Sequence, residues 1–271
     1  MTHTDQADAA YDHIDVTAAD GIGRVTMNRP EIMNALAPPM MAEIIAAMAD
    51  LGADSSVRCV IIAGAGKGFS AGGDLNFLDD LTETRPFDVK DSVYRYFGAG
   101  IKAIKLFEKP TIAAVQGAAV GAGCEIALAC DFRIAAEDAF FRESWIDLGL
   151  ISPLGGMVLL PRLVGLGKAT EMLMLGKKVD AAEALAIGLV NDVVARYDLE
   201  GAATMLAERL AAGPPLGLRA MKEGLRRGGE SSLAAEWDNN VNVQSMLIDS
   251  DDFAEGVAAM KERRKPDFKG K

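Results

Sequence analysis

The sequence predicts an α/β fold that ends in an all-helical segment. Short apolar runs typical of buried strands, such as residues 57–63 and 111–115, alternate with runs of helical spacing. From Asp198 onward every segment is predicted to be a helix. Such a change from mixed to all-helical chain marks a domain boundary near residue 196. The two predicted units are an α/β unit at residues 1–196 and a helical unit at residues 197–271.

The first half of the chain alternates predicted strands, turns and helices. Residues 1–10 are polar and small and are expected to be disordered. Residues 14–27 alternate enough to predict a β-hairpin, with Asp20 and Gly21 at its turn. The elements predicted after it are a loop at 28–36, a helix at 38–51, a strand at 57–63, a mobile flap at 75–87 and a long helix at 89–108.

The stretch from Lys109 to Arg133 organises the rest. It predicts a strand, a turn that contains Gly117, Gly121 and Gly123, and then a helix. This order directs the free N–H groups of a helix N-terminus at whatever occupies the turn. The elements predicted after it are strands at 132–136 and 189–194, with helices at 155–163, 168–175, 180–187, 199–212, 216–226, 232–248 and 253–264.

Composition excludes several classes of function. The chain has 39 acidic and 28 basic residues, a net charge of -11, which disfavours binding to nucleic acid or to an anionic membrane surface. We find no signal peptide and no apolar run of ~18 residues. The three cysteines lie in apolar surroundings without metal-type spacing, as expected of free thiols in a reducing cytosol. A cytoplasmic location is therefore expected.

The scarcity of histidine narrows the chemistry further. The only two, His3 and His13, lie in the N-terminal segment. A Ser–His–Asp triad and a histidine-based zinc site are therefore disfavoured, and no metal is expected. Acid–base chemistry must fall to carboxylates.

Two glycine-rich turns, at residues 64–75 and 117–125, follow predicted strands. The first fails the P-loop spacing, because Ile61 and Gly68 stand where a Gly and a Ser or Thr are required. The second lacks the third glycine of a dinucleotide fingerprint. Two such turns can each donate one N–H to a single oxygen, which is the usual construction of an oxyanion hole.

Several ordered motifs resemble those of the crotonase superfamily, the enoyl-CoA hydratases and isomerases. They are N-R-P-E-I-M-N-A-L at 28–36, F-S-A-G-G-D-L at 69–75, the stretch 109–131, A-F-F-R-E-S-W-I-D-L-G-L-I-S-P-L-G-G at 139–156, and further matches as far as 268. The resemblance covers nearly the whole chain after about residue 12. It implies a spiral of ββα units whose helical tail packs into a homotrimer or a dimer of trimers. The apolar helices after residue 196 independently predict an oligomer surface.

The resemblance also implies site residues. The oxyanion-hole donors would be the N–H groups of Ala71 and Ala122, and Glu125 matches a catalytic glutamate of the hydratases. The substrate is an acyl-CoA thioester, so coenzyme A is part of the substrate and no separate cofactor is expected. The residues expected to bind the substrate are Arg29, Ile32, Asn34, Ala35, Ala71, Gly72, Gly73, Asp74, Leu75, Gly121, Ala122 and Trp145.

One position departs from the family pattern. Trp145 stands where the hydratases carry a second catalytic glutamate, and tryptophan cannot transfer a proton. Glu143 lies two residues earlier and would share a face with Trp145 in an extended strand, so it is either a replacement acid or a surface carboxylate.

Three functions remain open on this basis. Enoyl-CoA hydratase is the first expectation. An isomerase that uses one carboxylate, on enoyl-CoA or on a ring substrate like epoxyphenylacetyl-CoA, is the second. The third is an acyl-CoA binding protein without turnover. The sequence does not specify the acyl group.

Overall fold

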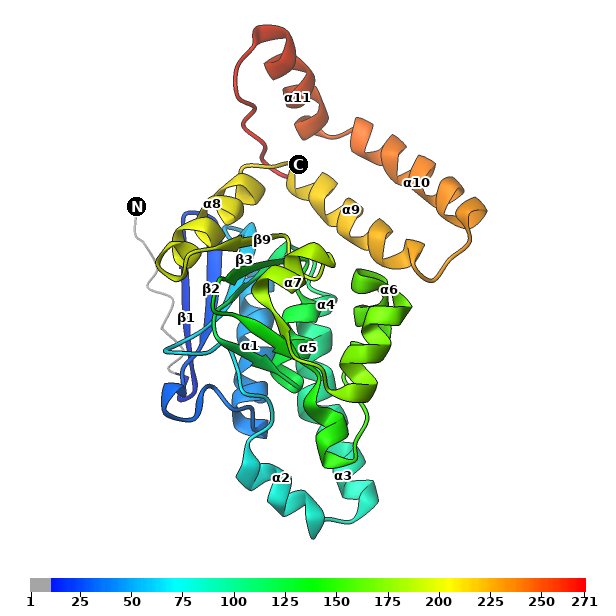
Figure 1. Cartoon of the computed structure of the whole chain (residues 1–271). Helices are drawn as coiled ribbons and strands as arrows, with labels where there is room; N and C mark the ends of the chain where they lie inside the picture. The colour runs from blue at the N-terminus through cyan, green and yellow to red at the C-terminus, as the bar shows by residue number, and fades with distance from the viewer. Residues whose placement is uncertain (1–10) are drawn as a thin grey trace.

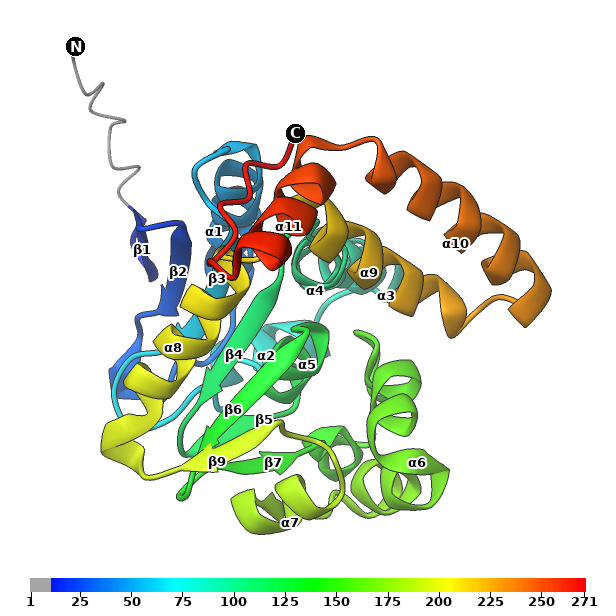
Figure 2. The ribbon, with the colours of Figure 1, turned by 90° about the horizontal axis from the view of Figure 1, so that it is seen from above.

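The computed structural model describes residues 11–271, so the expected disorder of residues 1–10 lies outside the described part. A six-stranded sheet runs through the α/β unit in the order β1-β2-β3-β4-β6-β9 (Figures 1 and 2). Only β1 and β2 pair in an antiparallel manner, and all the other neighbours are parallel. The strands are β1 (Ile14–Ala19), β2 (Ile22–Met27), β3 (Cys59–Gly64), β4 (Thr111–Val115), β6 (Phe132–Ala136) and β9 (Asp192–Val194).

A second sheet of three short strands was not predicted from the sequence. It has the order β5-β7-β8, with β5 (Ala118–Val120), β7 (Phe140–Arg142) and β8 (Val179–Asp180). Pairing such as Ala118 with Phe140 and Phe140 with Asp180 joins distant parts of the chain. Strands of two or three residues carry almost no periodic signal, and only this long-range pairing defines them.

Eleven α-helices lie within residues 11–271. They are α1 (Pro38–Ala53), α2 (Leu75–Thr82), α3 (Pro86–Ser92), α4 (Ala99–Lys105), α5 (Ala122–Ala129), α6 (Gly156–Leu175), α7 (Ala181–Ala186), α8 (Leu199–Ala211), α9 (Pro215–Gly228), α10 (Leu233–Ile248) and α11 (Asp251–Glu262). The helix predicted at 89–108 is divided by a π-helical segment at Val93–Gly98. The two helices predicted at 155–163 and 168–175 form one element with a kink at Gly165, whose φ is 76°.

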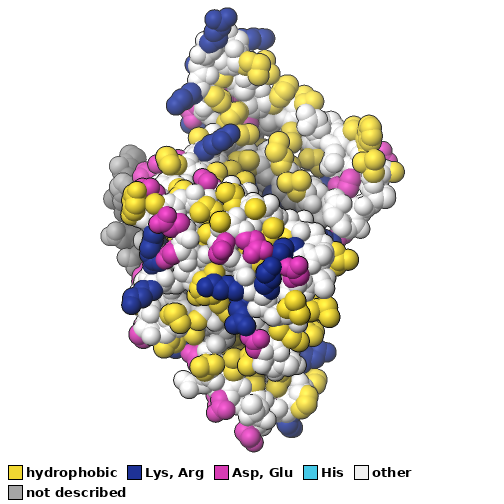
Figure 3. Space-filling view, in the orientation of Figure 1, with side chains coloured by type: hydrophobic (Ala, Val, Ile, Leu, Met, Phe, Trp, Pro, Cys, Tyr) yellow, Lys and Arg dark blue, Asp and Glu magenta, His cyan; other side chains and the backbone are white. Residues whose placement is uncertain are grey.

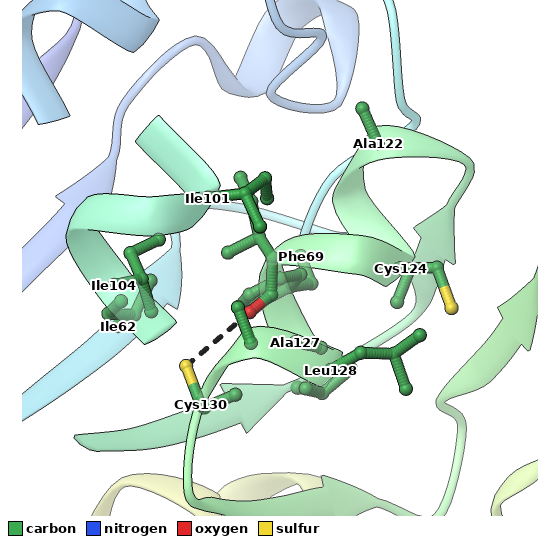
Figure 4. Close-up of a cluster of buried hydrophobic side chains, with 14 of the residues drawn as sticks. Ile62, Phe69, Ile101, Ile104, Ala122, Cys124, Ala127, Leu128 and Cys130 are labelled. Atoms are coloured by element: carbon green, nitrogen blue, oxygen red, sulfur yellow. Dashed lines mark hydrogen bonds between the residues drawn. The ribbon is translucent and has the colours of Figure 1, made fainter. Parts of the chain in front are cut away.

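The sheet has apolar side chains on both faces, as expected of a largely parallel sheet. The larger cluster packs α1, α4 and α5 against one face. Figure 4 shows part of it, with Ile101 and Ile104 on α4 and Ala127 and Leu128 on α5. No helix of residues 11–271 is both long and apolar enough to cross a membrane.

The smaller cluster shifts the predicted domain boundary. Leu199, Ala203 and Ala207 of α8 pack against Ile61 and Ile112 on the opposite face of the sheet. Helix α8 therefore belongs to the α/β core, although it lies beyond residue 196. The helices that leave the core are α9, α10 and α11, which project from one end of the molecule (Figure 1).

Candidate active site

The two glycine turns are joined to each other. The Ser70 N–H donates to Ala118 O at 2.8 Å, and the Val120 N–H donates to Ser70 O at 3.0 Å. Gly72, with φ of 95°, also lies close to the second turn. A methyl group on Gly72 would lie 2.7 Å from Val120 O and 3.8 Å from Ala122 N. Only glycine fits this position. The turn after β3 therefore lies directly against the N-terminus of α5.

Hydrogen bonding decides which N–H groups of the first turn are free. The Ala71 N–H donates to Met33 O at 2.8 Å, the Gly72 N–H to Ser70 Oγ at 3.2 Å, and the Asp74 N–H to Leu36 O at 2.8 Å. Within residues 11–271, the Gly73 N–H has no such acceptor. The geometry therefore argues against Ala71 as an oxyanion-hole donor and favours Gly73, two residues later.

The second donor lies at the start of α5. Gly121 precedes the helix with φ of 50° and ψ of −120°, a conformation suited to glycine. Ala122 is the first helical residue, so its N–H has no acceptor within the helix. This position agrees with the expectation for Ala122. The helix dipole adds to the preference of this N–H for a negatively charged oxygen.

Glu125 lies one turn into α5 and is completely buried. Its Oε1 accepts hydrogen bonds from Ser152 Oγ at 2.6 Å, Gly156 N at 2.7 Å and Leu154 N at 3.2 Å. Its Oε2 is buried and has no partner. One oxygen is therefore fixed by the chain before α6, and the other is available to a ligand.

Glu143 is also completely buried, so the interpretation of it as a surface carboxylate is wrong. It follows β7, whose pairing with β5 and β8 directs this part of the chain into the core. A methyl group on Gly156 would lie 2.8 Å from Glu125 Oε1 and 3.1 Å from Glu143 Oε1. Both carboxylates therefore approach one point.

The environment raises the pKa of both carboxyl groups. Burial raises the pKa of Glu125, and the hydrogen bonds from Ser152, Gly156 and Leu154 oppose that rise. Burial, followed by the charge of Glu125, raises the pKa of Glu143, while the Cys124 thiol and the Trp145 indole oppose it. Two buried acids this close do not both ionise readily, so they favour a state with one shared negative charge.

Trp145 lies beside this pair. Its ring edge would be 3.8 Å from a methyl group on Gly121, which places it next to the start of α5. Within residues 11–271, six buried side-chain atoms lack a hydrogen-bond partner, and four of them are here: Glu125 Oε2, both Glu143 oxygens and Trp145 Nε1. Buried polar atoms are normally paired, so this concentration indicates the site of a small polar molecule or substrate group.

The residues expected to bind coenzyme A form a tightly bonded loop pair. The Arg29 guanidinium lies 3.0 Å from Asp74 Oδ2 and donates to Ala35 O at 3.0 Å. Asn34 is completely buried, and its amide donates to the carbonyls of Ala65, Gly68 and Phe69. Asn34 therefore holds the loop, and its side chain does not reach the surface.

The remaining expected contacts differ in exposure. Ile32 and Leu75 are exposed beside this loop pair, while Ala35 is buried. The sequence interpretation missed Ser152 and Gly156, which hold Glu125. The sequence feature that could have revealed them is the segment 152–156, a short glycine-containing stretch before a helix. Such a segment brings further N–H groups into the site. Within residues 11–271, no cluster of His, Cys, Asp and Glu is arranged to hold a metal ion.

The layered α/β core, the paired glycine turns and the projecting helices define a crotonase-type protein. The chain belongs to the enoyl-CoA hydratase/isomerase family, whose model matches residues 17–271.

Named relatives and solved structures agree with this family. The crotonyl-CoA hydratase of Syntrophomonas wolfei is 36% identical over 264 residues, which cover 96% of this chain and 98% of that protein. The 1,2-epoxyphenylacetyl-CoA isomerase of Escherichia coli is 36% identical over 93% of this chain and 96% of that protein. The crystal structure of an enoyl-CoA hydratase from Bacillus anthracis superposes with a TM-score of 0.90 at 33% identity, over 96% of this chain and all of that one.

Proposed function

We propose that this enzyme is an enoyl-CoA hydratase, which adds water across the conjugated double bond of a 2-enoyl-CoA. The observation that carries the proposal is the buried pair of Glu125 and Glu143, with three of its four carboxylate oxygens unpaired. Hydration in the two-glutamate enzymes needs two carboxyl groups around the water. The pair supports this reaction even though Trp145 stands at the family position of the second acid.

The proposed oxyanion hole consists of the N–H groups of Gly73 and Ala122. The thioester oxygen would accept from both, and its negative charge grows as the enolate forms. Fixed donors aimed at that oxygen stabilise the enolate without reorganisation.

The two glutamates would have different roles. Three hydrogen bonds favour the charged form of Glu125, whereas Glu143 has none. Glu125 is therefore the base and Glu143, protonated, is the acid. Glu125 takes one proton from water as the water oxygen bonds to the β-carbon, and Glu143 gives its proton to the α-carbon of the enolate. A proton then passes from Glu125 to Glu143 to restore the resting state.

Isomerisation is the second candidate. It requires one base, and two observations favour it: Trp145 replaces the second family acid, and the E. coli isomerase is as similar to this chain as the S. wolfei hydratase.

The substrate and assembly complete the proposal. The acyl-CoA would lie along the loops that Arg29 and Asp74 join, and its phosphates require positive charge from Arg29 or from C-terminal lysines. The protein would assemble as a homotrimer or a dimer of trimers.

Absorbance of the conjugated thioester tests the proposal. The wild-type enzyme should hydrate crotonyl-CoA, and Glu125→Gln and Glu143→Gln should each lose at least a hundredfold in kcat, as expected for proton carriers. Glu137→Gln, at an exposed glutamate, is the matched control. An active Glu143→Gln variant with an inactive Glu125→Gln variant would favour the isomerase, and turnover of 3-enoyl- and arylacetyl-CoA thioesters would then identify its substrate.

A further inference from the structure

The Trp145 indole N–H is not explained by a role of this side chain in packing alone. Its indole N–H is buried and has no acceptor, although the ring is only partly buried and its edge faces the start of α5. A buried donor without a partner costs free energy in the resting protein. A phenylalanine would fill the same space without this cost.

Glu143 lies two residues earlier, and both of its buried carboxylate oxygens also lack a hydrogen-bond partner. The Trp145 indole opposes the rise of the Glu143 pKa, so it favours the carboxylate over the carboxylic acid. The resting geometry does not form a normal hydrogen bond between the two groups. The indole N–H and both Glu143 oxygens are therefore buried and unpaired in the structure described here.

We propose that Trp145 is a positioning residue for Glu143, whose carboxylate it stabilises through the indole N–H once Glu143 has given up its proton. The inference rests on the proposed role of Glu143 as the acid. An ionised carboxylate buried without partners is costly, and a hydrogen bond to a charged acceptor is stronger than one to a neutral acceptor. The residue at the family position of the second glutamate thus supports an acid displaced by two residues.

Few other groups can stabilise that charge. The titratable side chains that face Glu143 are Glu125 and Cys124, both on α5, and burial raises the pKa of the Cys124 thiol. From the elements packed on β7, Lys178 precedes β8, Asp180 is the last residue of β8, and Glu183 lies on α7. Asp180 caps α7, Lys178 lies over the Phe140 ring, and Glu183 pairs with Lys168. Besides the Cys124 thiol, which is a weak donor, the indole N–H is therefore the donor available to Glu143.

Trp145→Phe tests the inference in the pH profile. It keeps the ring and removes the N–H, so the pKa of Glu143 should rise and the alkaline limb of kcat should move to higher pH. The value of kcat should fall roughly tenfold to a hundredfold, as expected for losing a hydrogen bond to a charged group, with little change in KM. An unshifted profile with wild-type kcat would overturn the inference.

Fluorescence gives a second test that does not require turnover. The chain has two tryptophans, and Trp237 is 65% exposed on α10, so Trp237→Phe leaves Trp145 as the only emitter. Its emission should change with pH as Glu143 ionises, and Glu143→Gln should abolish that change in a protein shown by circular dichroism to be folded. A pH-independent emission, or a change that persists in Glu143→Gln, would overturn the contact. Failure of the proposed hydration appears separately, in the crotonyl-CoA assay.

Discussion

Glu125 and Glu143 are both completely buried and lie close to each other. These two features distinguish them from the carboxylates on the surface. Each has a raised pKa because burial disfavours its charge. Between pH 4.5, the ordinary value for glutamate, and these raised values, the folded protein holds protons that the unfolded chain releases. The stability contributed by the pair is therefore complete below pH 4.5 and is lost as the pH rises through the folded values.

Glu143→Gln should make the free energy of unfolding less sensitive to rising pH. The variant cannot ionise, so its stability relative to wild type should increase between pH 5 and pH 8, by about 1.4 kcal/mol for each unit by which the pKa is raised. Urea unfolding at the two pH values measures this difference. The fixed cost of the buried amide is the same at both values and cancels. Glu137→Gln should show no such trend, and equal trends in both variants would contradict the assignment.

Ala122→Pro isolates one donor of the proposed oxyanion hole. Proline is well tolerated at the first position of a helix, so the change removes the N–H while leaving α5 largely intact. The value of kcat should fall roughly a hundred- to a thousandfold. Leu233→Pro, at the exposed first position of α10, is the matched control and should keep wild-type kcat. A folded Ala122→Pro enzyme with near-normal turnover would rule out Ala122 as a donor.

At the scale of elements, the start of α6 controls Glu125. Ser152 Oγ and the N–H groups of Leu154 and Gly156 all donate to one carboxylate oxygen. These donors favour the ionised form, which the proposed base requires. The loop before α6 is therefore part of the site, although it lies about thirty residues from Glu125 in sequence.

Ser152→Ala should move the acid limb of the pH profile to higher pH. Loss of the hydroxyl donor raises the pKa of Glu125 further, so less of the base is ionised at a given low pH. The value of kcat near pH 6 should therefore fall more than the value near pH 8. Ser245→Ala, on α10, removes a hydroxyl that bonds only to backbone carbonyls and should leave the profile unchanged. Parallel profiles for Ser152→Ala and wild type would contradict the role of Ser152.

Local patterns predicted the elements that depend on local contacts. The hairpin at 14–27, the helix that became α1 and the helices from α8 to α11 were correct, because alternation and helical spacing reflect one buried face. The burial of Glu143 was not predictable in this way. It depends on β5, β7 and β8, which pair across long sequence separations.

The oxyanion-hole donor of the first glycine turn was also not predictable from local sequence patterns. Sequence spacing placed it within residues 69–75 but selected Ala71. Only the hydrogen bonds from Ala71 to Met33 and from Asp74 to Leu36 identify Gly73 as the unpaired N–H. Which donor is free depends on how two distant loops meet.

At the scale of the whole molecule, the projecting helices have more apolar surface than one chain covers. Figure 3 shows hydrophobic side chains across these helices, and the exposed ones include Met221, Leu225, Trp237, Val241 and Met246. A groove of about 530 Å³ on α10 is lined by Leu233, Glu236, Trp237, Asn240, Val241, Gln244, Ser245 and Ile248. Contiguous apolar surface of this kind marks an interaction site.

The last prediction is that α10 forms an interface between copies of this chain. Sedimentation at micromolar concentration should give a trimer or hexamer for the wild-type protein. Trp237→Asp should shift it to monomer, because a charge in a buried interface must be desolvated without a partner. Phe87→Asp, at an even more exposed aromatic residue on α3, is the matched control and should keep the wild-type assembly. A monomeric wild-type protein would contradict the prediction outright. An unchanged assembly in Trp237→Asp would move the interface away from α10, onto another face of the projecting helices.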